Sequence, residues 1–180
     1  DIVDSQTNPE QCDDGNLIDG DGCSAMCGLS GGYNALAVEP WDEYYKVYMT
    51  IDNNTIKNNT GNGITYSSIS ESTLSNNTFE YNAMQSDNSG IGIISGSDID
   101  IFGNSLSYQG GNGILLDGDS GIKSRRINVY DNVVDHSSAI LDPHYSAWFG
   151  IWIDEADSIN VYDNTFYAEN GRGFAIGGTA

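Results

Sequence analysis

The sequence predicts an all-β fold built as a solenoid, and three observations indicate it. A short pattern, apolar-x-apolar-x-x-Asn-x-apolar, recurs five times, and each copy is followed by Gly-apolar-x-apolar. The copies keep a fixed underlying spacing, and their apolar residues alternate with polar ones, as along a β-strand. No helical stripe of apolar residues persists over three turns. Short strands at a fixed period of roughly 20 to 50 residues are typical of solenoids.

The Asn of each copy sets the register of the repeat. The five residues are Asn54, Asn77, Asn104, Asn132 and Asn164. The Gly of the second half follows 9 residues later in three copies, and 13 or 18 residues later in the other two. The return from Gly to the next Asn takes 14 residues in three cases and 19 in the fourth. A basic period of 23 residues with three insertions therefore underlies all five copies, and a coil of that length suits a parallel β-helix.

The repeat resembles the right-handed parallel β-helix of pectate-lyase-like proteins over roughly residues 45–180. The resemblance implies about five coils that stack at about 4.8 Å, so that like residues form ladders. We expect the five repeat Asn residues in an inward ladder at a tight turn, where their amides bond the turn backbone and one another. Two buried apolar ladders should accompany it. Their members are Ile64, Ile91, Ile114, Ile151 and Phe174 in one, and Ile56, Phe79, Leu106, Val134 and Phe166 in the other.

Residues 1–30 differ from the repeat and contain all three cysteines. The stretch C-D-D-G-N-L-I-D-G-D-G-C-S-A-M-C at 12–27 resembles the Myxococcus-type cysteine-rich repeat of secreted and cell-surface proteins. Members of that family usually carry a further cysteine upstream, where this chain has only the D-I-V-D of residues 1–4. We therefore expect one disulfide among Cys12, Cys23 and Cys27, in any of the three pairings, and a partner outside these 180 residues for the third thiol.

The same loop is rich in oxygen ligands. Its candidates are Asp13, Asp14, Asn16, Asp19 and Asp21, whose oxygens could cage a calcium ion in a Gly-permitted turn. The loop is not an EF-hand, because no Glu stands at the twelfth position. An acidic disulfide knot without metal is the alternative, and a zinc site lacks a fourth ligand because no His is nearby.

Composition limits the classes of partner. The formal net charge is −20, from 26 acidic and 6 basic residues, so a phosphate backbone would be repelled and we expect no nucleic acid. No apolar run approaches the 18 residues or so of a membrane span. The chain begins with Asp1, which we interpret as a processed or excised piece of a longer precursor. We expect an acidic cysteine-rich module at 1–30, a linker and cap at 31–45, and the β-helix at 46–180.

Three Asn-Asn-Thr sequons begin at Asn53, Asn58 and Asn76. Asn53 and Asn76 stand one place before a repeat Asn, at a position that should face solvent, so glycosylation is sterically feasible in a secreted host. The alternative is that these residues supply only the turn chemistry of the coil.

The insertion at residues 139–148 holds the best catalytic candidates. Its Asp142-Pro143-His144 resembles the D-P-H motif of mannuronan C-5 epimerases, which implies proton abstraction next to a uronate carboxylate with Asp142, His144 and Tyr145 as the working groups. That family's Tyr three places before the Asp is Ala139 here, and the fourth coil has no Lys or Arg before or within this loop. Crowded carboxylates in this coil would also suit glycoside hydrolysis, or simply an acidic solvated face. We therefore expect a non-enzyme, with a uronate epimerase or lyase-like enzyme as the alternative.

Aromatic residues predict a binding surface. Two places before each repeat Asn the outward residues are Asp52, Ser75, Phe102, Tyr130 and Tyr162. The last three should form an exposed stripe on adjacent coils, and Trp152 is the outward residue of another strand. Such rings stack on sugars or bury against another protein, unless they cover one another. A calcium-dependent carbohydrate-binding module is thus a further alternative.

The last copy ends at residues 176–180 without a capping helix, so we expect either that the natural chain continues or that another subunit stacks there. These features together favour an extracellular or cell-surface structural or adhesive module of a larger protein or filament. Its expected partners are a further copy, the rest of a longer surface protein, or a polysaccharide.

Overall fold

The computed structural model describes residues 34–38, 48–83, 88–135, 149–167 and 172–177. These residues form sixteen β-strands in three sheets. No helix that is long and apolar enough to cross a membrane occurs within these ranges.

Each sheet takes every third strand of the chain. Sheet A consists of β1 (Leu36–Val38), β4 (Ile64–Ser67), β7 (Ser89–Ile94), β10 (Asn112–Asp117), β13 (Phe149–Ile153) and β16 (Arg172–Ile176). Sheet B consists of β2 (Thr50–Asp52), β5 (Ser70–Ser75), β8 (Ser97–Phe102), β11 (Ser124–Tyr130) and β14 (Ala156–Tyr162). Sheet C consists of β3 (Thr55–Lys57), β6 (Thr78–Glu80), β9 (Ser105–Ser107), β12 (Val133–Asp135) and β15 (Thr165–Tyr167).

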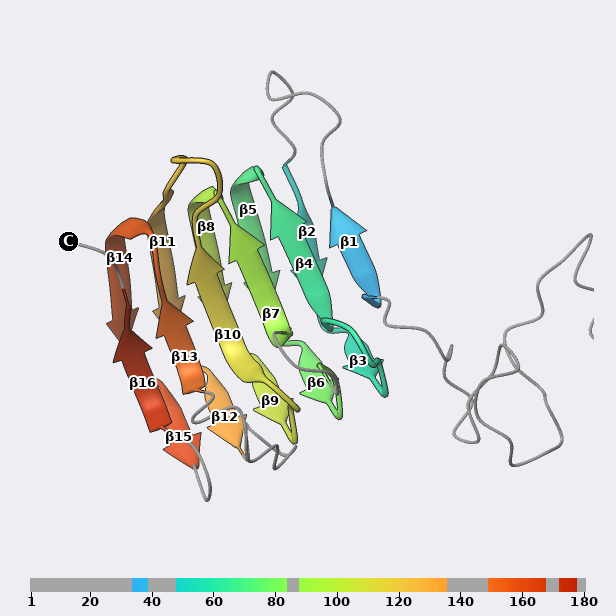
Figure 1. Cartoon of the computed structure of the whole chain (residues 1–180). Helices are drawn as coiled ribbons and strands as arrows, with labels where there is room; N and C mark the ends of the chain where they lie inside the picture. Colours follow the sequence, from blue (N-terminus) through green and yellow to red (C-terminus); the bar gives the residue numbers. More distant parts are fainter. Residues whose placement is uncertain (1–33, 39–47, 84–87, 136–148, 168–171, 178–180) are drawn as a thin grey trace, which may run out of the picture.

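Every neighbouring pair within these sheets is parallel, as a solenoid requires. The chain passes from sheet B to sheet C to sheet A and then starts the next coil, so β2, β3 and β4 lie beside β5, β6 and β7. Figure 1 shows the successive coils stacked as parallel layers. The register follows the sequence repeat, with Ile91 paired to Ile64 on one side and to Ile114 on the other. The predicted all-β parallel solenoid is confirmed.

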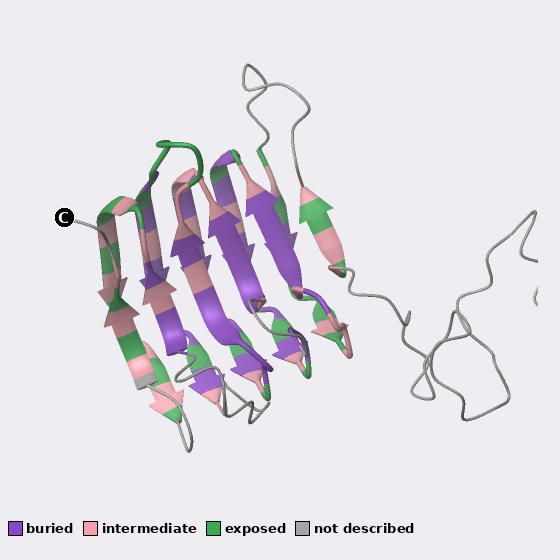
Figure 2. Cartoon of the chain, in the orientation of Figure 1, coloured by how far each residue is buried: buried purple, intermediate pink, exposed green. Residues whose placement is uncertain are grey.

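The core lies between the three sheets and includes members of both predicted apolar ladders, together with further buried residues of sheets A and B such as Ile93, Ile101 and Leu116. Ile64, Ile91, Ile114 and Ile151 are fully buried, and so are Phe79 and Leu106. Figure 2 shows burial concentrated in the middle strands and declining toward both ends of the stack.

The prediction that the whole of both ladders is buried is wrong at the ends of the stack. Phe174 is 42% exposed because β16 pairs with β13 on one side only. Ile56 and Phe166 are only partly buried for the same reason, since β3 and β15 are the edge strands of sheet C.

The Asn ladder forms at the turn between sheets B and C. The Oδ1 atom of Asn104 accepts hydrogen bonds from the backbone N–H and the side-chain amide of Asn77, both at 3.0 Å. Its Nδ2 donates to Oδ1 of Asn132 at 3.0 Å and to the carbonyl oxygen of Leu74 at 2.9 Å. The same pattern links Asn54 to Asn77 and Asn132 to Asn164. Each amide thus satisfies turn groups that would otherwise be buried without partners.

A second amide ladder stands five residues further on, and sequence reasoning missed it. Asn59 donates to Asn82 at 2.7 Å, and Asn82 donates to the carbonyl oxygen of Ile56 at 2.9 Å. In the next coil Gln109 donates in the same way to the carbonyl oxygen of Phe79 at 3.0 Å. The amide-bearing residues at a constant offset of five from the repeat Asn were the available signal.

The repeat Gly stands at or just before the start of β4, β7, β10, β13 and β16, where two coils approach closely. A Cβ on Gly113 would lie 2.5 Å from the carbonyl oxygen of Gly150 and 2.6 Å from Cγ1 of Val134. A Cβ on Gly63 would likewise lie 2.5 Å from the carbonyl oxygen of Gly90. From Gly63 to Gly150 the column is therefore Gly because the neighbouring coil's carbonyl oxygen takes the space of a side chain, whereas at Gly173, on the edge strand, the nearest atom is 3.4 Å away.

Candidate functional site

The predicted aromatic stripe forms on the outer face of sheet B. The register pairs Phe102 with Tyr130 and Tyr130 with Tyr162 at the ends of β8, β11 and β14. Ring centroids lie 4.9 Å apart in the first pair and 5.0 Å apart in the second, with interplanar angles of 7° and 1°. The three rings therefore stack along the solenoid axis at the coil spacing.

This stacking decides which ring surfaces are available. Tyr130 has Phe102 against one face and Tyr162 against the other, so it presents its edge and hydroxyl to solvent. Tyr162 ends the row and is 47% exposed. Of the two expectations for these rings, mutual covering describes Tyr130. Phe102 and Tyr162, at the two ends of the row, each have one face without a stacked ring among the described residues. The binding role of the stripe stays a prediction.

Ser75 keeps its place in the expected row, opposite Asp52 and Phe102, but it is only 4% exposed. Its hydroxyl donates to Oδ1 of Asp52 at 2.6 Å in the coil before it. Nδ2 of Asn76 donates to the same oxygen at 2.8 Å. The two hydrogen bonds lower the pKa of Asp52.

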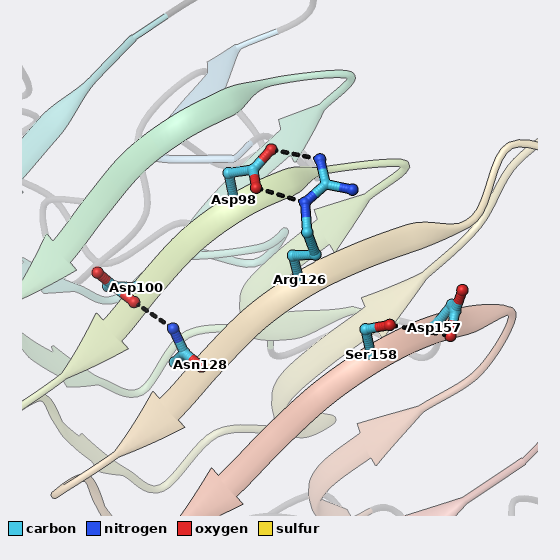
Figure 3. A network of polar contacts seen from close by, with 6 residues as sticks. All are labelled: Asp98, Asp100, Arg126, Asn128, Asp157 and Ser158. Atoms are coloured by element: carbon cyan, nitrogen blue, oxygen red, sulfur yellow. Dashed lines mark hydrogen bonds and ion pairs between the residues drawn. The ribbon is translucent and has the colours of Figure 1, made fainter.

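Two polar rows run beside the aromatic one, and their members also bond from coil to coil (Figure 3). Nδ2 of Asn128 donates to Oδ1 of Asp100 at 2.7 Å, and Asn160 donates to Asn128 at 2.8 Å. In the other polar row, which lies further from the aromatic stripe along the strands, the Arg126 guanidinium donates twice to the carboxylate of Asp98, at 2.5 and 2.6 Å. The hydrogen bonds from Arg126 lower the pKa of Asp98, and the positive charge of Arg126 adds to the effect.

Trp152 lies on a different face from the stripe. It belongs to β13, where the register places it between Leu115 and Ala175 on the outer side of sheet A. Its ring meets that of Phe149 at 4.4 Å with an interplanar angle of 59°. The structure thus brings together three of the four predicted binding aromatics and separates the fourth.

A second aromatic pair was not predicted. Tyr81 and Tyr108 stack at 5.0 Å with an interplanar angle of 9°, just after β6 and β9. Both residues have positive φ, near 53°. The signal lay in the equal offset of four residues from each repeat Asn.

The sequon residues lie in turns, as their positions predicted. Asn53 and Asn76 are exposed, whereas Asn58 is half-buried. Their φ angles are 58°, 54° and 61°, in the left-handed region that Asn tolerates better than most residues. Turn chemistry thus accounts for Asn at these sites, and glycosylation stays a prediction.

Several predicted site residues fall outside the described ranges. They are the catalytic candidates Asp142, His144 and Tyr145, the calcium candidates Asp13, Asp14, Asn16, Asp19 and Asp21, and the cysteines Cys12, Cys23 and Cys27. Within the described part of the chain no group of three His, Cys, Asp or Glu residues is arranged to hold a metal ion.

The loop that follows β10 leaves the coil at the corner between sheets A and B. Ser95 Oγ donates to the carbonyl oxygen of Ile122 at 2.9 Å and accepts from the backbone N–H of Asp119 at 3.0 Å. Asp119 and Ile122 also bond each other through their backbones. Burial raises the pKa of the nearby Asp117, and its neighbouring carboxylates, chiefly Asp154, raise it further.

Comparison with known proteins agrees with this architecture. The family described as right handed beta helix region matches residues 30–180, which is most of the chain. The curated proteins and the solved structures gave no match. The stacked parallel coils and this match together show that the chain belongs to the right-handed β-helix family.

Proposed function

We propose that this chain is a structural module of a larger surface protein or filament, with an adhesive contribution from a few open aromatic faces. The observation that carries the proposal is the pairing of outward residues from coil to coil. Both faces of Tyr130 are covered by neighbouring rings, and Asn128 bonds the coils on either side of it.

Such pairing stabilises the stack. Each stacked ring pair contributes about 0.5–1.5 kcal/mol beyond area burial, and each hydrogen bond about 0.5–1.5 kcal/mol net. Because these contacts join adjacent coils, they strengthen the coupling on which a solenoid depends. Side chains already engaged in this way are poorly placed to engage a ligand by the same groups.

The adhesive contribution rests on rings that are not covered in this way. Tyr162 keeps one ring face without a stacked partner in the described coils, and Trp152 is half-exposed on sheet A. Aromatic faces of this kind bind sugar rings or bury against protein. The two rings lie on different sheets, which favours separate weak contacts over one continuous groove.

Assembly by coil stacking is supported by the exposure of the last coil. Phe174 and Ile176 occupy inward register positions opposite Ile151 and Ile153, yet are 42% and 72% exposed. A second copy, or a further coil of a longer chain, stacked on β16 would bury them and pair its free backbone groups.

An extracellular setting belongs to the same proposal. The sequons at Asn53, Asn58 and Asn76 and the cysteine-rich stretch at 12–27 support it. We further propose that the acidic loop at 13–21 binds calcium and links this module to its neighbours.

A uronate epimerase or lyase-like enzyme, the activity that the pectate-lyase-like and D-P-H resemblances imply, is the second candidate. The D-P-H motif at 142–144 supports it. Against it, three of the five cations in the described ranges lie in the loop after β10 or at the start of β11. The five are Lys57, Lys123, Arg125, Arg126 and Arg172. The loop after β10 connects sheets A and B. The D-P-H motif lies in the segment between β12 and β13, which connects sheets C and A.

One experiment separates the two candidates. Sedimentation velocity over a range of concentrations measures self-association, and release or epimerisation of uronate units measures catalysis, each on the full chain and on His144→Ala. The structural proposal expects concentration-dependent assembly and no turnover by either protein. Turnover that His144→Ala abolishes, by a chain that stays monomeric, would refute it.

A further inference from the structure

The two ends of the solenoid leave their apolar columns open to different degrees. We call the last coil, β14 to β16, the tail, and the first strand of each sheet, β1 to β3, the head (Figure 1). Ile51 at the head is 9% exposed, whereas Val161 at the tail end of the same column is half-buried. Val38 at the head is half-buried, whereas Ile176 at the tail end of its column is 72% exposed. The tail is therefore the more open end.

The tail presents three free strand edges. Within the described residues β14, β15 and β16 each pair with one strand of the coil before and with none beyond. Only residues 178–180 follow the tail in this sequence, and three residues cannot add a coil of 23. Free backbone groups at the edge of a sheet favour pairing with another chain. The residues that follow the tail in this sequence therefore do not cover it, and a second copy of the chain is the simplest source of a matching surface.

The head of a second copy is a poor match for the tail because it is stepped. Sheet A has six strands, whereas sheets B and C have five each, and the additional strand is β1, one level beyond β2 and β3. At the tail the three sheets end at the same level. If β1 of a second copy paired with β16, its β2 and β3 would lie about 9.6 Å from β14 and β15, twice the interstrand spacing. A gap of one strand would remain in two of the three sheets.

We propose that two copies of this chain pair tail to tail about a two-fold axis perpendicular to sheet A. The inference rests on the proposed structural function and specifies its partner. The N–H of Gly177 donates to the carbonyl oxygen of Ile153, toward β13. Because backbone groups alternate in direction along a strand, the N–H and carbonyl groups of Phe174 and Ile176 face the open edge. An antiparallel β16 of the second copy, centred on Phe174, bonds these groups and brings the two Phe174 side chains opposite each other.

This arrangement is self-complementary, as a two-fold interface requires. Phe174 and Ile176 occupy inward positions in the columns of Ile151 and Ile153, and the axis keeps the inner faces of both sheets on the same side. Both open tails are thus covered in a single step, whereas head-to-tail stacking always leaves one tail open. The dimer directs both heads outward, so a fibre needs a second joint, which the calcium loop proposed at 13–21, upstream of β1 in sequence, would supply.

The test is sedimentation velocity of the full chain with a calcium chelator, which removes the second joint. The ionic strength is about 0.15 M, so that the charge of −20 on each copy is screened beyond about 8 Å. We expect a monomer–dimer equilibrium that stops at the dimer. Ile176→Lys should weaken dimerisation about tenfold or more. Two controls should change it less than about twofold: Val38→Lys, in the same column at the head, and Ile122→Lys, which is 52% exposed in the loop after β10.

Thermal unfolding keeps the test decisive. Ile176→Lys should unfold like the parent, because the side chain is already exposed, and Phe174→Ser is a second tail variant that should also weaken the dimer. Assembly beyond the dimer that Ile176→Lys and Val38→Lys weaken alike would overturn tail-to-tail pairing and leave the structural function standing. A dimer that neither tail variant weakens would overturn the interface. A monomer at every concentration would overturn the dimer, and a parallel run with calcium then decides whether the structural function fails as well.

Discussion

Replacing Asn104 by Ala should destabilise the whole solenoid. The side chain is 1% exposed and takes part in five hydrogen bonds, with partners on the coil before it, on its own coil and on the coil after it. The truncation leaves the buried backbone N–H of Asn77 without this acceptor. It also removes a donor from the carbonyl oxygen of Leu74.

The expected magnitude follows from these contacts. A buried group left unsatisfied costs about 1–3 kcal/mol, and a hydrogen bond between satisfied groups contributes about 0.5–1.5 kcal/mol net. Because some carbonyl oxygens keep a second partner, we expect a loss of about 3–5 kcal/mol for the whole set. For a chain of this length that lowers Tm by roughly 10 °C.

The measurement is urea and thermal unfolding followed by circular dichroism. Asn160→Ala is the matched control, because Asn160 is exposed and, among the described residues, its side chain donates to Asn128 alone. That variant should lose less than about 1 kcal/mol. Equal losses for the two variants, or a loss below about 1 kcal/mol for Asn104→Ala, would refute the role assigned to the ladder.

Three further outcomes are expected. Gly113→Ala should lower the unfolding free energy by about 1–3 kcal/mol through overpacking. Gly92→Ala, whose Cβ would meet nothing nearer than 3.7 Å, should unfold like the parent. Similar losses for the two variants would contradict the close approach of the Gly150 carbonyl oxygen to Gly113. Tyr130→Ala should lose about twice as much as Tyr162→Ala in the same assay, since it has two stacked rings against one. Arg126 lowers the pKa of Asp98, so the stability from that pair should be complete above the usual carboxylate pKa and vanish as pH falls through the lowered value. Asp98→Asn should therefore flatten the acid limb of a stability-against-pH curve, and an unchanged limb would show that the pair contributes nothing.

The parts of the fold that could be predicted are those set by one residue type at a constant spacing. The Asn ladder was predictable because Asn recurs in all five copies at the same place. The second ladder was not, because Gln109 stands where earlier coils have Asn59 and Asn82. Its longer side chain reaches the same kind of carbonyl oxygen, which a search for identical residues overlooks.

The stripe illustrates a different limit. Alternation predicts that Tyr130 points outward, but it carries no information on ring orientation, which here turns both faces toward neighbouring rings. The pair of Asp98 and Arg126 was hidden for a backbone reason. Both residues have positive φ, 57° and 52°, which interrupts the strict alternation of their strands. The exposure of Phe174 likewise follows from its place on the edge strand β16, which the alternation of apolar and polar residues around it does not reveal.

The most direct test of the structural proposal is negative-stain electron microscopy of the native material, with and without a calcium chelator. The proposal predicts regular fibres or sheets, and their loss under chelation would assign the loop at 13–21 a part in holding them together. Isolated short rods in both conditions would contradict assembly by coil stacking.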